Sequence, residues 1–578
     1  MTATDTATSE TTDPATRPDD EVSPTRNPVD AFVSVLTTGD HKVVGRLWIV
    51  MSLLVGGFTL VLGALVGIER TDTAGVDVFA GLEAYLQFST LYRVLLVFGF
   101  VVPLFIGLAT YLVPLQIGSP SVAFPRAAAA AFWAWLVGLG TLITAWALDG
   151  GLVPGGEPEA VELSLLAFGA TVIALLLAAA VIVTTVFTQR AEGMTMDRVP
   201  LFSWSMVVAG GLWVLSLPVL LANLGVAWID IRGEGPTLYG NGENLWGQVE
   251  WAFDQPQVFA YLIPALGVIG EVFVSAFRAR QPLHFVMQGA IGAVGVLSFG
   301  AYAQTFFNPT ADTTPPYVVA GVAIALPVLV LLGGWATLAR DAGGRPTPSP
   351  QLGFAVATVL AVLAAVAVGV VKVLGGLLGF LREFGADTQS WQADLDDFLD
   401  PFEDLRGSAI ESGLLNVVVL AGFIGAVAGL YHWAPKLFGR RLNPLVGGLA
   451  ALLILVGTLA LVVPDVITGF MDQPDPLAAG FPLLGDFRDG VEILNAISMI
   501  GAFVVFAGLA LVALDVLGAI AVPGAGDGDD ADDLGGVTLE WSTTNPPPPG
   551  NFAAAPVVRS EAPLLDPPAG DATDGEDA

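Results

Sequence analysis

The stretch "VVGRLWIVMSLLVGGFTLVLGALVGI", residues 43–68, is an apolar run that carries no charged residue after Arg46. A helix needs about 20 such residues to cross the hydrocarbon core of a bilayer. Because a backbone in lipid has to satisfy its own hydrogen bonds, a run of this kind is predicted to be a transmembrane helix. Eleven further apolar segments of spanning length follow it, at 86–114, 127–149, 161–188, 201–228, 255–277, 284–307, 316–339, 353–381, 409–434, 444–468 and 491–520. The sequence therefore predicts an all-α integral membrane protein built as a twelve-transmembrane-helix bundle.

The composition supports this class. The chain has 578 residues, of which 54% are hydrophobic and only 13% charged, with a mean hydropathy of +0.71. Soluble domains carry about 25% charged residues. Residues 1–38 are rich in Thr, Asp and Pro and lack the apolar core of a signal peptide, so they are predicted to form a disordered acidic tail. Residues 39–520 are predicted to form the membrane domain and residues 521–578 an acidic, Pro-rich C-terminal tail.

The net charge of −32 narrows the choice of partners. An acidic surface repels nucleic acid, so no nucleic-acid partner is expected. The acidic excess favours a salt-adapted organism, and ordinary solvated acidic tails are the alternative. Most Lys and Arg residues fall on one set of loops when the N-terminus is placed inside. This bias predicts a multi-pass protein of the plasma membrane with both termini in the cytoplasm.

Redox and metal chemistry is limited by the side chains that the chain owns. It contains no Cys, which excludes disulfides and thiolate metal ligands, and only three His. His41, His284 and His432 all fall at the ends of predicted spans or in loops on the inner side. We therefore expect interfacial histidines rather than ligands deep in the bundle.

Five stretches, taken together and in order, carry a resemblance to a known family. They are "DHKVVGRLWIV" (40–50), "YLVPLQIGSPSVAFPR" (111–126), "GMTMDRVPLFSW" (193–204), "LYHWAPKLFGRRLN" (430–443) and "TLEWSTTNPPPPGNF" (538–552). In this order they resemble subunit I of the haem-copper oxidases, which is a twelve-helix bundle. "QPQVFAYLIPALG" (255–267) resembles the stretch of the sixth span that carries a copper-binding His in that family. The resemblance thus implies a fold of the oxidase subunit I type.

The resemblance also implies a site with two haems and copper held by six imidazoles, more than the chain owns. The family's haem-ligand positions fall here on Tyr92, Gly413 and Leu415, and its copper-ligand positions on Gln255, Gln304 and Thr305. A Gln amide is a poor copper ligand beside imidazole. Positions on the proton paths fall on Ser121, Gln257 and Leu331, the redox-active Tyr on Phe259, and the Arg pair that holds the haem propionates near Asp475 and Pro476. We therefore predict that no catalytic, cofactor-binding or metal-binding residue of the family is retained and that the chain binds no cofactor.

Other ligands remain possible in principle. Tyrosine ligates ferric haem in some proteins, so Tyr92 is one alternative. Met194, Met196, Met206 and Met287 are soft donors, although Met in a membrane helix is usually a packing residue. Asp394, Asp396, Asp397 and Asp400 form an acidic loop that could hold a hard cation, against the simpler reading of a solvated loop.

A few charged residues lie inside or at the edge of predicted spans. Arg93 is expected to need an acidic partner. Asp254 is the first choice and Asp465 the second, and Glu250 is a further candidate. The alternative is that Arg93 extends to the outer surface. Lys372 and Asp515 are predicted to be isolated charges, and Glu271 is predicted to have a structural role. If haem is absent, its space is expected to be filled by Tyr92, Phe259, Phe306 and Phe307, because protein interiors tolerate few voids.

These observations support a first hypothesis and two alternatives. The first is a non-catalytic subunit or scaffold of a respiratory membrane complex, with the lipid bilayer and other subunits of the complex as its partners. The second is an active terminal oxidase that reduces oxygen. The third is a transporter that uses the vacated cavity. Only Arg93 and Lys372 support this hypothesis.

Overall fold

The computed structural model describes residues 33–71, 78–153, 155–233, 245–303, 314–383, 405, 407–477, 490–521 and 534–567. The chain divides into two compact units, Met1–Thr38 and Gly39–Ala578, and the architecture below is that of the second unit. Its described secondary structure is helical, with two isolated β-bridges, Glu192 to Val557 and Ser408 to Pro474.

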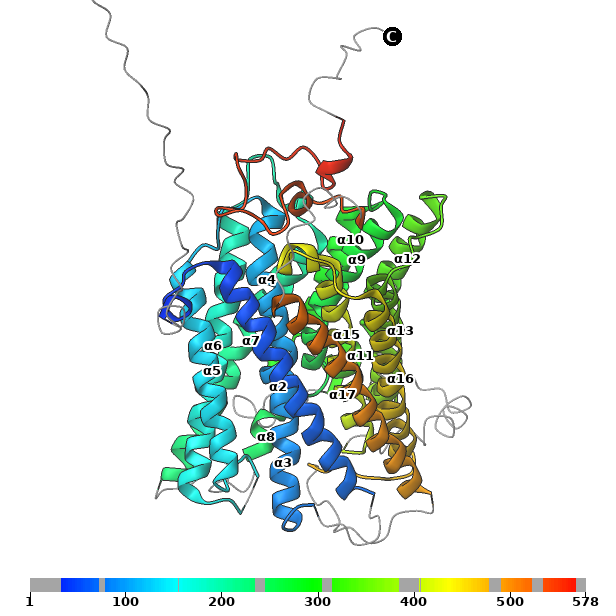
Figure 1. Ribbon diagram of the computed structural model, residues 1–578. Coiled ribbons are helices and arrows are strands. Elements are labelled where there is room, and N and C mark those ends of the chain that lie inside the picture. The colour runs from blue at the N-terminus through cyan, green and yellow to red at the C-terminus, as the bar shows by residue number, and fades with distance from the viewer. Residues whose placement is uncertain are drawn as a thin grey trace, which may run out of the picture. The chain divides into compact units, whose positions relative to one another are not determined.

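The long helices lie side by side in a bundle (Figure 1). In chain order they are α2 (His41–Glu69), α3 (Leu82–Val94), η1 (Leu95–Val101), α4 (Val102–Ile117), α5 (Pro125–Ala147), α6 (Pro158–Thr188), η2 (Met196–Arg198), α7 (Leu201–Arg232), α8 (Leu245–Val249), η3 (Glu250–Ala252), η4 (Gln257–Tyr261), α9 (Ile263–Phe277), α10 (His284–Leu297), η5 (Ala301–Ala303), α11 (Thr314–Ala323), α12 (Ala325–Asp341), α13 (Pro350–Glu383), α15 (Ile410–Phe438), α16 (Pro444–Gly469), α17 (Val491–Ala521), η8 (Leu539–Ser542) and η9 (Pro563–Leu565).

Within the described residues, eleven helices are long and apolar enough to cross a membrane. A shorter apolar helix, α9, stands where the sixth span is predicted. The all-α membrane bundle predicted from the sequence is confirmed. The sixth span differs from the prediction of 255–277, because its first turns form the 3-10 helix η4 and the α-helix begins only at Ile263.

Local sequence signals set several helix ends. The side chain of Asp40 accepts the N–H of Lys42 at 2.9 Å and caps the start of α2. Asn443 caps α16 in the same way, which satisfies N–H groups that a helix start leaves without partners. Gly118 and Gly439 end α4 and α15 in the left-handed conformation that glycine adopts without strain.

Two spans form the centre of the bundle. Leu82–Ile117, which comprises α3, η1 and α4, and Ile410–Phe438, which is α15, are fully buried over their most apolar stretches. The other spans bury 39 to 61% of theirs and expose the rest. Leu445, Val296 and Phe285 are 73 to 83% exposed, as expected of side chains that face lipid tails. Any site that α3 and α15 share therefore lies inside the bundle.

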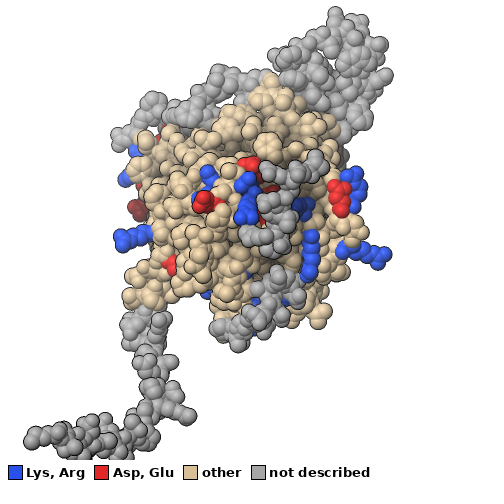
Figure 2. All heavy atoms as spheres, turned by 90° about the horizontal axis from the view of Figure 1, so that it is seen from above, with Lys and Arg blue, Asp and Glu red and all other residues tan. Residues whose placement is uncertain are grey.

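Residues 534–567 of the predicted C-terminal tail fold onto one end of the bundle, here named the tail side. The Lys42 Nζ donates to the carbonyl of Pro548 at 2.8 Å, and the Arg280 Nη2 lies 2.6 Å from the Asp566 carboxylate. Glu540 is fully buried and accepts hydrogen bonds from Gln116 and Trp433. Figure 2 views this side, where Lys and Arg side chains are spread over the described surface.

Candidate functional site

The positions that resemble a copper site lie where η4 enters α9. Gln257 is 1% exposed, and both ends of its amide are bonded. Its Nε2 donates to the Ser216 hydroxyl at 3.1 Å, and its Oε1 accepts the N–H of Gly300 at 3.0 Å. Gln257 therefore ties η4 to α7 and to the end of α10, which is a structural task.

Gln255 differs from Gln257. Its side chain is 3% exposed, and neither amide atom has a hydrogen-bond partner in the described part of the chain. Phe259, at the position of the family's Tyr, is 1% exposed and packs against Gly369. Gln304 and Thr305, the other two copper-ligand positions, lie outside the described residues, as do Phe306 and Phe307.

The haem-ligand position of the second span is occupied by a side chain that contacts the tenth span directly. The Tyr92 hydroxyl donates to the Asn416 Oδ1 at 2.7 Å. The Tyr92 ring packs on Gly63, where an added Cβ would lie 2.5 Å from the ring. Leu415 is 2% exposed, and a Cβ on Gly413 would come within 3.2 Å of Asp465. The Tyr92 oxygen, which could otherwise ligate iron, is thus engaged in a hydrogen bond to Asn416.

Arg93 forms the most completely buried ion pair of this region. Its Nη2 lies 2.5 and 2.6 Å from the two carboxylate oxygens of Asp475 and 3.0 Å from the Ser412 hydroxyl. The Ser412 hydroxyl in turn donates to Asp475 at 2.7 Å. The prediction of Asp254 or Asp465 as its partner was wrong, because the loop after α16 folds back and brings Asp475 to α3.

Lys372 is the second buried cation, and the prediction that it is isolated was wrong. Its side chain is fully buried, and its Nζ pairs with the carboxylate of Asp254 and with that of Glu411, the latter at 3.0 Å. Asp515, also predicted to be isolated, accepts hydrogen bonds from the Tyr431 hydroxyl and the Asn443 N–H, each at 2.9 Å.

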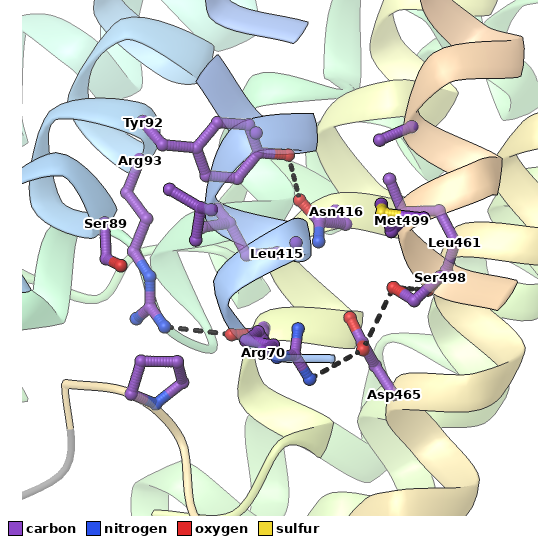
Figure 3. Close-up of a pocket in the computed structure, with 16 residues that line it drawn as sticks. Arg70, Ser89, Tyr92, Arg93, Leu415, Asn416, Leu461, Asp465, Ser498 and Met499 are labelled. Carbon is purple, nitrogen blue, oxygen red and sulfur yellow. Dashed lines mark hydrogen bonds and ion pairs between the residues drawn. The ribbon is translucent and has the colours of Figure 1, made fainter. Parts of the chain in front are cut away.

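Arg70 completes the set of cations, and the sequence offered no reason to select it. Its Nη2 lies 3.1 Å from Asp465 and 3.2 Å from the Asn495 side chain, and Ser498 also donates to Asp465. Figure 3 shows Arg70, Asp465 and Ser498 linked on one side of the pocket, with Tyr92 and Asn416 linked on the other. Its place two residues beyond the predicted first span was the only available signal.

The surroundings shift the pKa values of two buried carboxyl groups, those of Glu250 and Asp475, in opposite directions. Burial, with Glu411 and Asp254 nearby, raises the pKa of Glu250 from its ordinary 4.5 to about 8. Burial would also raise the pKa of Asp475, but the charge of Arg93 and the hydrogen bonds from Leu477 and Ser412 outweigh it and hold that pKa below its ordinary value. Asp475 is thus held as an anion, whereas Glu250 favours its neutral form near pH 7.

A cavity of about 50 Å³ lies between α2, α3, α15, α16 and α17. Its lining includes Arg70, Tyr92, Arg93, Leu415 and Asp465 (Figure 3). A cavity of this size has room for a few water molecules. The lining offers no imidazole and no free tyrosine hydroxyl, and the residues present do not fit a haem.

The proton-path positions also carry side chains that cannot titrate near pH 7. Leu331 is fully buried in α12, and Ser121 is half-buried in the turn before α5, where its backbone pairs with Ser119. Glu271 accepts the N–H of Phe202 at 3.4 Å, in keeping with the structural role predicted for it.

The three histidines lie apart, at the tail side. The His41 and His284 rings contact Asn551 and the carbonyl of Val199, at 3.3 and 3.0 Å. His432 is 1% exposed, and neither ring nitrogen has a hydrogen-bond partner in the described part of the chain. Among the described residues no group of three or more His, Asp or Glu could hold a metal ion. The acidic loop from Asp394 to Asp400 lies outside the described residues.

The alternative methionine ligands are spread through the molecule. Met194, Met206 and Met287 are at most 4% exposed and pack in the main hydrophobic core, against which Met196 also packs. Met287 contacts the backbone at Gly334. Their surroundings are those of packing residues.

The comparisons with known proteins all indicate the same protein family. Residues 43–382 match the family model described as cytochrome c and quinol oxidase polypeptide I. The chain is 30% identical to cytochrome c oxidase subunit 1 of Bacillus subtilis, over 92% of this chain and 82% of that protein. It is also 30% identical to the putative cytochrome c oxidase subunit 1-beta of Streptomyces coelicolor, over 93 and 90%.

The fold agrees with a solved structure. A haem-copper terminal oxidase dimer, determined by cryo-electron microscopy, matches with a TM-score of 0.61 over 84% of each chain, at 14% identity. This likeness concerns the fold alone. The family match, the relatives and the bundle together show that this chain is a multi-pass membrane protein that belongs to the haem-copper oxidase subunit I family.

Proposed function

We propose that this chain is a non-catalytic member of its family, a structural subunit of a respiratory membrane complex that keeps the oxidase bundle without its redox centres. The observation that carries the proposal is the hydrogen bond of 2.7 Å between Tyr92 and Asn416. Axial ligands from the second and tenth spans would lie on opposite faces of a haem. A direct bond between side chains of these two spans leaves no space for a porphyrin between them.

The charges around this bond support the same proposal. Where the family carries an Arg pair for the haem propionates, this chain carries Asp475, and Arg93 of α3 pairs with it. The protein thus supplies the carboxylate itself. A buried ion pair persists only when both partners are present and further hydrogen bonds satisfy them, and Ser412 and the Leu477 N–H provide these here.

The proposal also covers the location of the chain in the cell and its partners. By the positive-inside rule, the distribution of Lys and Arg along the sequence supports a chain in the plasma membrane with both termini in the cytoplasm. The exposed apolar side chains of the bundle would contact lipid and other subunits. Relatives that are named as subunit 1 support assembly into a complex of this kind.

A dithionite-reduced visible spectrum of the detergent-purified full chain, with elemental analysis for iron and copper, tests the proposal. We expect no stoichiometric Soret band and no stoichiometric copper, with oxygen consumption at the level of the detergent blank. The Bacillus subtilis relative, prepared in parallel, controls for loss of cofactor during purification. A stoichiometric haem band or cyanide-sensitive oxygen consumption would establish the active oxidase instead, which the names of the relatives favour.

The transporter hypothesis loses its support. It rested on Arg93 and Lys372 as charges without an evident role, and both now have buried carboxylate partners.

A further inference from the structure

The largest of the cavities described lies far from the family's redox centres. It measures about 240 Å³ and opens at the tail side, between the end of α9, the starts of α13 and α16, and the last turns of α15. Exposed Arg441 and Pro444 stand at its mouth, and buried His432 lines its interior. A water molecule takes about 30 Å³ of liquid, so this cavity admits a polyatomic ligand.

His432 is the feature that points to a ligand. Its ring is 1% exposed and packs edge-on against Trp433 and Trp541 at centroid distances of 5.0 and 5.2 Å. Neither nitrogen finds a hydrogen-bond partner among the described residues. Buried polar groups are nearly always hydrogen-bonded, and a neutral imidazole always carries one N–H to donate. The donor therefore needs an acceptor that the described protein does not supply.

The rest of the lining favours an oxyanion as that acceptor. Arg441 contributes a guanidinium, the residue type that binds phosphate with paired N–H donors. The Ser349 hydroxyl accepts the N–H of Leu352, which leaves its own hydrogen to donate. The starts of α13 and α16, at Pro350 and Pro444, bring the positive ends of two helix dipoles to the same cavity.

Groups that would oppose an anion are already engaged. The last carbonyls of α9 accept backbone N–H groups, with that of Ala276 bonded to Thr347 at 3.0 Å. The Asp515 carboxylate accepts from Tyr431 and from Asn443, so its charge is partly offset. We propose that this cavity binds a phosphate group, carried by a lipid headgroup or by free phosphate, through Arg441, His432 and Ser349.

Histidine NMR of the full chain in neutral detergent tests the proposal directly, because the chain has only three histidines. The protein is labelled with carbon-13 at the imidazole Cε1, and the His432 resonance is assigned with His432→Phe. One arm titrates inorganic phosphate at constant ionic strength against chloride. The other titrates phosphatidylglycerol against phosphatidylcholine in mixed micelles.

We expect one arm to shift the His432 resonance saturably while those of His41 and His284 stay in place. A shift with inorganic phosphate identifies a site for free phosphate, and a shift with phosphatidylglycerol alone identifies a lipid phosphate. Arg441→Gln should weaken the binding roughly tenfold, as for loss of a hydrogen bond to a charged group. Arg440→Gln, the adjacent exposed arginine that does not line the cavity, should leave it unchanged.

Two results would overturn the proposal. One is a His432 resonance that neither arm moves in the folded wild-type protein. The other is equal weakening by Arg440→Gln and Arg441→Gln, since that would mark a general surface attraction. Because Arg441 is exposed, its variant is expected to fold, and tryptophan fluorescence on heating verifies this.

Discussion

The two ends of the bundle differ in the cavity that each contains and in how the buried basic side chains beside it are paired. On the side away from the tail, Arg70, Arg93 and Lys372 all have carboxylate partners, and the space among the groups around Tyr92 is about 50 Å³. On the tail side, a cavity of about 240 Å³ holds His432 with both nitrogens unpaired in the described protein. Of the two cavities, the larger one lies at the tail side, and the smaller one lies beside Tyr92.

The proposed function implies a way in which a membrane bundle can lose a large cofactor. A haem in a bundle provides both apolar surface and negative charge. Under the proposed function, the Tyr92 ring against Gly63 takes the place of the apolar part, and Asp475 beside Arg93 takes the place of the charge. Interiors are packed closely, so a vacated space has to be filled or it destabilises the fold.

The largest effect is expected for Lys372→Met. This change removes the one cation that two carboxylates, Asp254 and Glu411, share. An unpaired buried charge costs about 3–5 kcal/mol, so the apparent melting temperature in detergent should fall strongly. Arg340→Met, which removes a 76% exposed cation, is the control and should change little. Equal melting temperatures for the two variants would contradict a stabilising role for the ion pairs of Lys372 with Asp254 and Glu411.

Arg93→Leu is expected to cost about 3–5 kcal/mol or slightly less, since it strands one carboxylate. A second substitution identifies the partner. Asp475→Asn should restore part of the stability of Arg93→Leu, whereas Asp254→Asn should not, because Asp475 is the residue bonded to Arg93. Thermal unfolding of the single and double variants measures this coupling. Rescue by Asp254→Asn alone would refute the assignment.

The Glu250 carboxyl predicts a pH dependence. Its pKa is raised from 4.5 to about 8, so the folded protein holds its proton more tightly than the unfolded chain. Stability from this group is therefore full below about 4.5 and is lost as the pH rises toward 8. Glu250→Gln should flatten the fall in melting temperature across this window. An unchanged pH profile in the variant would count against a buried, neutral Glu250.

The smallest effect is expected at Gln255. Its amide is buried without partners, so Gln255→Leu should leave stability unchanged or raise it slightly. Gln257→Leu is the matched comparison and should cost about 1–3 kcal/mol, because it strands the N–H of Gly300. If both variants lose the same stability, the two glutamines are not distinguished in the way that their hydrogen bonds indicate.

The sequence by itself determined the fold class and most element positions. Apolar length fixes a spanning helix because the bilayer sets one thickness, and eleven spans emerge close to their predicted bounds. The sixth was less accurate, since the polar stretch around Pro256 forms 3-10 turns before α9 starts. The residues at the family's ligand positions remain a prediction from the motifs that the sequence shares with the family.

Only the tertiary structure decided how the buried charges pair. Arg93 and Asp475 are separated by most of the chain, and Lys372 meets Asp254 and Glu411 from two other spans. Sequence shows that a charge in a span needs a partner, but the choice depends on helix rotation and on how loops fold back. Those are set by the packing of all the helices together. The same holds for His432, whose place in a cavity follows from four helix ends that meet only in the folded bundle.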